Sequence, residues 1–271
     1  FNLGVIYEDG KYITQDINKS IHYLTLAANQ NDPNAQYNLG MINLLGKNRN
    51  RGINLLDKSS SAGNILANFV MGYLYHEGKN IDRNMSKSIK HYKYASTFNN
   101  FYSKNNLGVI HKNGIGNEIS KNIGYAIEYF NESIERWEDK LSMYNLAHIY
   151  LYEFKSGEKI NESIDLLIRS SNQNFEASKY LLFIALFKKY KFDFEKMKKE
   201  LIEKSSNVIE PILQMFLKIK SNGESYFQQI ENDFKTIDFL YELNYLPIQS
   251  KYALNQTKEQ SHEKLKEITQ S

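Results

Sequence analysis

Asparagine residues that recur directly before a leucine are the side chains best suited to recognise another molecule. They are Asn2, Asn38, Asn106 and Asn145, and Val70 takes the corresponding position once. A carboxamide offers a hydrogen-bond donor and an acceptor, the two groups that an extended peptide backbone presents. Asparagine also suits the interior of a helix poorly, because its amide competes with the backbone. The four asparagines therefore predict a peptide-binding surface, and inheritance from one ancestral repeat is the competing interpretation.

Aromatic side chains accompany these asparagines at two positions. Phe1, Tyr37, Phe69 and Tyr144 lie two residues before the leucine or methionine of the same phrase, and Tyr73 and His148 follow the phrase directly. Aromatic rings contribute a large contact area at low conformational cost, and beside amides they favour peptide binding. Packing between neighbouring helices is the alternative interpretation for both groups of rings.

Residue patterns that would place an enzyme or a metal site do not occur in this sequence. The six histidines form no pair four residues apart, and the chain has no cysteine for a thiolate nucleophile or a zinc–sulfur site. The segment from Gly40 to Asn48 has the wrong spacing for a phosphate loop, and Gly114-Ile115-Gly116 lacks a third glycine. We therefore expect no catalytic residues, no metal and no cofactor.

A lysine-rich segment runs from Lys188 to Lys204, with seven lysines and four acidic residues. It could attract acidic partners or anionic lipid. A solvated helix face is the interpretation that we adopt, because charges of both signs are interspersed along it.

The elements that position these side chains follow from a repeat. A leucine–glycine phrase appears at Leu3-Gly4, Leu39-Gly40, Met71-Gly72 and Leu107-Gly108, and continues in weaker form at Leu146-Ala147 and Leu181-Leu182. The second residues of these phrases are 36, 32, 36, 39 and 35 residues apart. Small residues recur with the same period at Ala27-Ala28, Ser59-Ser60, Ala95-Ser96, Ser133, Ser170-Ser171 and Ser205-Ser206. Each repeat is therefore predicted to contain two helices, an A helix with the leucine–glycine phrase and a B helix with the small residues.

Capping residues agree with this division. Gly10, Gly46, Gly78 and Gly114 each follow the phrase by six residues, where a helix end favours a left-handed glycine. Predicted helix starts are Asp16, Asn84 and Asn122 for B helices, and Asp32-Pro33 for an A helix. The second repeat has a shorter connection, because Gly52 follows Gly40 by only twelve residues.

Glycine inside an A helix requires a packing reason, because it costs about 1 kcal/mol relative to alanine. We expect it to let the A helix approach an alanine or serine of the B helix closely. Stability must then come largely from stacking between repeats.

Composition limits the remaining choices. Hydrophobic residues make up 41% of the 271, and the longest apolar run, Tyr180–Phe187, is far shorter than the ~20 residues of a membrane span. A net charge of +3 gives little attraction for a polyanion, so nucleic acid is not the expected partner. We expect a cytoplasmic protein, and the start at Phe1 suggests a fragment.

The repeat phrase resembles that of the Sel-one-like repeat family, a branch of the tetratricopeptide-like α/α solenoids. In the first repeat the matching residues are Leu3-Gly4, Tyr7, Gly10, Asp16, Lys19-Ser20, Tyr23, Ala27-Ala28 and Asn31. The resemblance is strong to about Ser133, weaker to about Asn207, and poor beyond. It implies an all-α, right-handed superhelical solenoid of about six to seven helix-turn-helix repeats. We assign residues 1–207 to about six repeats, the first truncated, and 208–271 to a diverged repeat or a helical C-terminal cap, with a final helix from Pro247 to about Ile268.

The resemblance also implies a non-catalytic adaptor that binds a protein or peptide on the concave face formed by its A helices. A regulatory repeat module attached to a catalytic domain, such as a protein kinase, is one alternative. A helical-repeat RNA-binding protein is another, and the near-neutral charge disfavours it. The residues expected to contact a peptide are Asn2, Asn38, Asn106, Asn145, Tyr37, Phe69, Tyr73, Tyr144 and His148.

Overall fold

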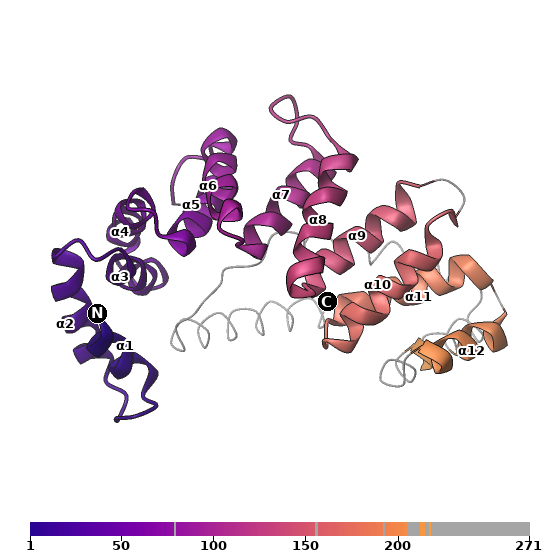
Figure 1. The fold of residues 1–271 in the computed structure, drawn as a ribbon, viewed down its shortest axis with the longest axis horizontal. Helices are drawn as coiled ribbons and strands as arrows, with labels where there is room; N and C mark the ends of the chain where they lie inside the picture. The colour runs from indigo at the N-terminus through magenta and orange to yellow at the C-terminus, as the bar shows by residue number, and fades with distance from the viewer. Residues whose placement is uncertain (79, 155–156, 192, 205–211, 215–216, 218–271) are drawn as a thin grey trace. The chain divides into compact units, whose positions relative to one another are not determined.

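The structure is a computed structural model, and it describes residues 1–78, 80–154, 157–191, 193–204, 212–214 and 217. The elements of these residues are twelve α-helices, and the one β contact among them is an isolated bridge between Ile115 and Ile119. The helices follow one another without intervening strands along the described chain (Figure 1). The prediction of an all-α fold is confirmed.

The described residues form two compact units, the first from Phe1 to Ser103 and the second from Lys104 to Leu217. The first contains α1 (Asn2–Asp9), α2 (Ile17–Asn29), α3 (Pro33–Leu45), α4 (Arg49–Ser61), α5 (Ile65–Glu77) and α6 (Met85–Thr97). Helix α7 (Phe101–Asn113) contains the boundary, and the second unit continues with α8 (Ile123–Trp137), α9 (Lys140–Tyr152), α10 (Ile160–Asn172), α11 (Glu176–Tyr190) and α12 (Phe194–Lys204).

Neighbouring helices pack in the order of a repeat array. In the first unit α1 packs on α2, α3 on α4 and α5 on α6, and the B helices α2 and α4 also pack on the next A helices, α3 and α5. The second unit repeats the pattern, because α9 packs on both α8 and α10, and α11 packs on both α10 and α12. The predicted alternation of A and B helices is thus present in each unit.

The predicted helix starts are confirmed by side-chain caps. The side chains of Asp16, Asn84 and Asn122 accept hydrogen bonds from the backbone N–H three residues later, at 3.0, 2.9 and 3.0 Å. Asp32 caps α3 in the same way, at 2.8 Å from the nitrogen of Ala35, and Pro33 takes the first helical position. These caps satisfy amide groups that the first turn of a helix leaves without an internal partner.

All four predicted helix stops are present, because α1, α3, α5 and α7 end directly before Gly10, Gly46, Gly78 and Gly114, but the expected left-handed backbone is found at only three of these glycines. Gly10, Gly78 and Gly114 are left-handed, with φ of 64°, 69° and 67°. Gly46 is extended instead, with φ of −87° and ψ of −155°. Only residues 46–48 connect α3 to α4, whereas residues 10–16 connect α1 to α2. The shorter connection predicted for the second repeat is therefore present, and its first residue, Gly46, is already extended.

In the first four A helices, the glycine of the phrase faces a large side chain of the B helix, which corrects the expectation of a small one. A Cβ atom on Gly4, Gly40, Gly72 or Gly108 would lie within 3.0 Å of Leu24, Leu56, Tyr92 or Phe130 respectively. The small residue of the B helix that lies one turn before this large side chain packs against the backbone of the A helix at the glycine. In the third repeat, the Ser88 hydroxyl donates to the carbonyl of Gly72 at 2.7 Å. Glycine therefore makes room for a leucine or an aromatic ring.

Besides the contact at the glycine, pairs of stacked aromatic rings also join the A helix to the B helix of the same repeat. Tyr7 stacks on Tyr23, Tyr75 on His91, and His111 on Tyr129, with ring centroids 5.7, 5.7 and 5.8 Å apart. The ammonium groups of Lys19 and Lys87 lie 5.2 and 5.0 Å from the ring centres of Tyr7 and Tyr75. Stacking and cation–π attraction both add to the burial of these rings.

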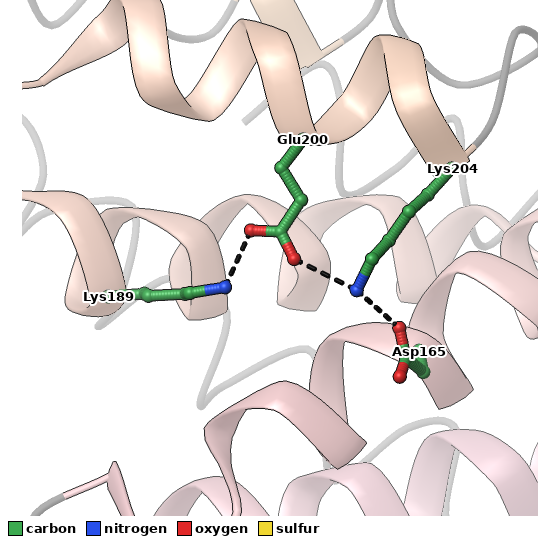
Figure 2. A network of polar contacts seen from close by, with 4 residues as sticks. All are labelled: Asp165, Lys189, Glu200 and Lys204. Carbon is green, nitrogen blue, oxygen red and sulfur yellow. Dashed lines mark hydrogen bonds and ion pairs between the residues drawn. The ribbon is translucent and has the colours of Figure 1, made fainter.

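Helix α12 is held by a network of charged groups, which Figure 2 shows. The buried carboxylate of Glu200 accepts from Lys189 of α11 at 2.7 Å and from Lys204 of its own helix at 3.0 Å. Lys204 also pairs with Asp165 of α10 at 2.7 Å. Met197 and Leu201 are buried on the same helix. Two of the lysines from the segment 188–204 therefore have a structural role, while Lys196, Lys198 and Lys199 are exposed as predicted.

No helix among the described residues is long and apolar enough to cross a membrane. The predicted final helix from Pro247 to about Ile268 lies outside the described residues, as does nearly all of the region 208–271.

Candidate peptide-binding surface

The candidate residues occupy two recurring positions on the A helices. Asn2, Asn38, Asn106 and Asn145 lie two residues before the glycine position of the phrase, and Tyr73 and His148 lie one residue after it. Residues three apart lie on the same face of a helix. The two positions therefore form one strip along each A helix, which we call the A-helix strip.

In the first unit this strip is accessible to solvent at three residues. Asn2 is exposed on α1, and Asn38 on α3 and Tyr73 on α5 are half-buried. Burial and the nearby Glu77 carboxylate raise the pKa of Tyr73 to about 12. The phenol therefore keeps its proton at neutral pH and can donate a hydrogen bond as well as accept one.

Three of the predicted aromatic residues lie in the core instead of on a surface. Tyr37 is 3% exposed, and Phe69 and Tyr144 are 0% exposed. Phe69 contacts the rings of Tyr92 and Tyr102 at centroid distances of 5.9 and 5.7 Å, and Tyr144 meets Phe175 edge-on at 5.5 Å. The packing interpretation therefore describes these three rings, because a side chain enclosed by its own fold has no face left for a partner.

In the second unit both predicted asparagines are buried, and they belong to a chain of carboxamides. Asn106 is 1% and Asn145 is 0% exposed. Asn105 lies between them, because its Oδ1 accepts from Asn145 Nδ2 at 3.0 Å while its Nδ2 donates to Asn106 Oδ1 at 3.5 Å. The chain connects α7 to α9, so these asparagines join two successive A helices of the second unit.

The buried carboxylate of Asp139 contacts Ser142, whose hydroxyl also lies near Asn105. Asp139 caps α9 by accepting from the backbone nitrogen of Ser142 at 2.9 Å, and it also accepts from the Ser142 hydroxyl at 2.6 Å. That hydroxyl lies 3.3 Å from Asn105 Oδ1, and its single proton favours the shorter contact. Burial raises the pKa of Asp139, while hydrogen bonds from Ser142, Leu141 and Ser133 oppose that rise.

His148 completes the A-helix strip in the second unit. Its imidazole is half-buried on α9, and its ring centroid lies 4.7 Å from that of Tyr152. Of the nine predicted residues, the four that remain partly or fully accessible are therefore Asn2, Asn38, Tyr73 and His148.

Two buried asparagines with clear partners were not predicted as site residues. Asn105 takes the position that an aromatic residue takes in the first, second, third and fifth repeats, and this departure from the pattern is the signal that could have singled it out. Asn68 Nδ2 donates to the carbonyl of Ser60 on α4 at 2.9 Å, and its Oδ1 contacts His91 Nδ1 on α6, also at 2.9 Å. Asn68 therefore links the second repeat to the third.

No group of three or more histidine and acidic side chains that could hold a metal ion occurs in the described parts of the chain. What the strip offers chemically is amide, phenol and imidazole groups for hydrogen bonding and ring contact. Such groups suit recognition of a polar, partly apolar chain such as a peptide.

Comparison with known proteins places this geometry in a family. The family model for the Sel1 repeat matches five segments, residues 1–32, 33–64, 65–97, 102–136 and 140–175, which together make up more than half of the chain. The protein belongs to the Sel1 repeat family. The matched repeats coincide with the helix pairs from α1–α2 to α9–α10, and the pair α11–α12 follows the last of them.

Two curated relatives share part of the chain. A putative sel1-like repeat-containing protein L21 of Acanthamoeba polyphaga mimivirus is 35% identical over 113 residues, 42% of this chain and 21% of that protein. The chitin synthase regulator SKT5 of Saccharomyces cerevisiae is 37% identical over 101 residues, 35% of this chain and 14% of the yeast protein. The matched region thus spans about a fifth or less of these relatives.

Two solved structures share the fold. The first is c5321, a protective antigen of uropathogenic Escherichia coli with the Sel1-like repeat fold, which matches at a TM-score of 0.61 and 24% identity over 69% of this chain and 40% of that one. The second is a Sel1 repeat protein from Oxalobacter formigenes. It matches at a TM-score of 0.64 and 18% identity, over 80% of this chain and 85% of that one. These matches confirm the predicted solenoid fold class. Sel1 repeat proteins are generally scaffolds for protein interactions.

Proposed function

We propose that this protein is a non-catalytic scaffold that binds a peptide segment of a partner protein along the A-helix strip of its first unit. The observation that carries the proposal is the recurrence of accessible amide and ring side chains at two helical positions of that unit, Asn2 and Asn38 at one and Tyr73 at the other. A bound peptide in extended form needs both hydrogen-bond partners for its backbone and ring surface for its side chains. The strip supplies both.

The charge of the protein is consistent with a protein partner. The net charge is +3, and lysines of the described chain are paired with acidic groups in several places, including Lys121 with Glu153 at 2.7 Å and Lys179 with Glu176 at 2.6 Å. A nucleic-acid reader would instead present unpaired cations along one face. Our proposal therefore excludes nucleic acid as the main ligand.

A second candidate function is regulation of an enzyme by a repeat module. A specific observation favours it, because one of the two curated relatives is named a chitin synthase regulator. In that case the strip would bind a segment of the enzyme that the module regulates. Both candidates make the same prediction about the strip, and they differ in whether the bound partner is itself catalytic.

The proposed function is tested by selection of peptides from a random display library against the purified 271-residue chain. We expect enrichment of peptides that bind wild type, and at least tenfold weaker binding to Tyr73→Ala and to Asn38→Ala. Asn54 is exposed on the B helix α4, and Asn54→Ala is the matched control that should bind as wild type does. Selected peptides that bind all three variants equally would place the binding surface elsewhere.

A further inference from the structure

A polar hollow lies where α5 connects to α6 in the first unit. Its volume is about 560 Å³. It is separate from the A-helix strip, because Tyr75 lines it and Tyr73, two residues earlier, faces another side of α5. Polar and charged residues make up most of the remaining lining, among them Asp82, Arg83, Asn84 and Lys87. The hollow therefore suits a charged group better than an apolar one.

Two cations are held at this hollow by contacts within the fold. The Lys87 ammonium lies 5.0 Å from the centre of the Tyr75 ring, so cation–π attraction restrains it there. Arg83 is anchored by its Nε, which donates to the carbonyl of His76 at 3.2 Å. Lys87 pairs with no carboxylate among the described residues. An ammonium group only donates hydrogen bonds, so the group that complements it is an anion.

The first repeat contains the same arrangement with an acid in place. There the Lys19 ammonium lies 5.2 Å from the centre of the Tyr7 ring, and the Asp16 carboxylate lies 3.6 Å from that ammonium. Asp16 and Asn84 are equivalent, since each caps its B helix by accepting from the backbone N–H of the lysine. The third repeat thus keeps the ring, the lysine and the cap, and has a neutral amide where the first repeat has the acid.

The charge of the lining limits which anion fits. Arg83 and Lys87 contribute two positive charges and Asp82 one negative charge, so the lining carries one net positive charge. A carboxylate balances that charge. A phosphate group, with a charge of about −1.5 to −2 at neutral pH, exceeds it and is repelled by Asp82.

We infer that this hollow binds an aspartate or glutamate side chain of a partner protein, with Lys87 as its ion-pair partner. The bound carboxylate takes the role toward Lys87 that Asp16 has toward Lys19 in the first repeat. The hollow gives the first unit a second contact surface, and its binding of a carboxylate does not depend on the A-helix strip.

The test follows the Lys87 side-chain signals by NMR while a tripeptide with a central glutamate, blocked at both ends, is added to the intact protein at low salt. We expect saturable shifts of the Lys87 signals, and none with the analogue that has a central glutamine. Lys19 is the internal control and should not shift, because Asp16 already pairs with it. Equal shifts at Lys19 and Lys87, no shift at Lys87, or tighter binding of inorganic phosphate than of the tripeptide would overturn the inference.

A variant supplies the missing carboxylate from within the fold. Aspartate caps α2 and α3 in this protein, so Asn84→Asp should keep α6 intact. The added acid should pair with Lys87 and weaken binding of the tripeptide about fivefold. Asn54→Asp adds the same charge at an exposed site on α4 and should bind as wild type does. Equal weakening in the two variants, or unchanged binding in Asn84→Asp, would overturn the inference.

Discussion

A Cβ atom placed on Gly72 of α5 would lie 2.6 Å from Cδ1 of Tyr92 on α6. Tyr92 is fully buried, so its ring is enclosed by other residues of the fold. The absence of a side chain at position 72 therefore sets how closely these two helices approach. Leu24, Leu56 and Phe130 take the place of Tyr92 in other repeats, and the same relationship recurs with Gly4, Gly40 and Gly108.

Replacement of this glycine should destabilise the protein. Gly72→Ala improves helix propensity by about 1 kcal/mol, but forcing a methyl group against the ring of Tyr92 should outweigh that gain and lower the free energy of unfolding by about 1 to 3 kcal/mol. Urea denaturation measures the change. Gly124→Ala is the matched control, because Gly124 is exposed in α8 and a Cβ atom there would meet only Asn122 Oδ1, at 3.4 Å. The control should be stabilised, and equal effects at both sites would contradict the packing account.

The carboxylate of Glu200 should hold α12 in place. Glu200→Gln removes the charge that pairs with Lys189 and Lys204, and we expect a loss of about 1 to 2 kcal/mol, because the lysines are partly exposed and solvent screens the pair. Hydrogen exchange of the α12 backbone amides is the measurement, and exchange should be faster in the variant. Glu203→Gln is the control, since this exposed residue lies 4.0 Å from Lys199. Unaltered α12 exchange in Glu200→Gln would show that the network is dispensable.

Acid should loosen the same helix. Burial alone would raise the pKa of Glu200, but hydrogen bonds from Lys189, Tyr190 and Lys204 hold it below the ordinary value of 4.5. A lowered carboxyl pKa stabilises the fold above the unfolded-state value, and that contribution disappears as the pH falls through the folded-state value. We expect α12 exchange to accelerate below about pH 4.5 in wild type. In Glu200→Gln the acceleration should be smaller, and an identical pH profile would contradict this assignment.

Stability of the first unit should fall at mildly acidic pH. Burial lowers the pKa of both His76 and His91, and the Asp57 carboxylate partly opposes the shift at His91. The unfolded chain then binds more protons than the folded one below about pH 6.5, so unfolding becomes easier as the pH drops. Melting temperature between pH 7.5 and 5.5 measures this. His91→Gln should flatten the dependence, whereas replacement of the exposed His22 by Gln should not; a flat profile in wild type would contradict the prediction.

The sequence predicted the helices well because their signals are local. Asp16, Asn84 and Asn122 cap the helices that they were expected to cap, since a cap depends on residues three positions away. Helix α3 ends at Gly46 as predicted, but the left-handed conformation expected there is wrong, because the conformation of a connection depends on its length as well as on its glycine.

The packing partners and the accessibility of the site were harder to predict. The small residues of the B helix recur with the same period as the glycine, yet the period cannot tell which B residue faces it, and Tyr92 does so rather than Ala95 or Ser96. Asn38 and Asn145 hold equivalent positions and differ in burial, because burial depends on the neighbouring helices of each repeat. A repeat pattern therefore gives the face of a helix, while neighbours decide what remains exposed on it.

Peptide affinity at Tyr73 tests the central claim most directly. A fluorescent peptide from the library selection is titrated into wild type, Tyr73→Ala and Asn54→Ala, each checked for unchanged helicity by circular dichroism. The account predicts that Tyr73→Ala raises the dissociation constant by about tenfold or more, a loss of about 1.4 kcal/mol or more, while Asn54→Ala matches wild type. An unchanged dissociation constant in Tyr73→Ala would contradict the claim that the A-helix strip binds the partner.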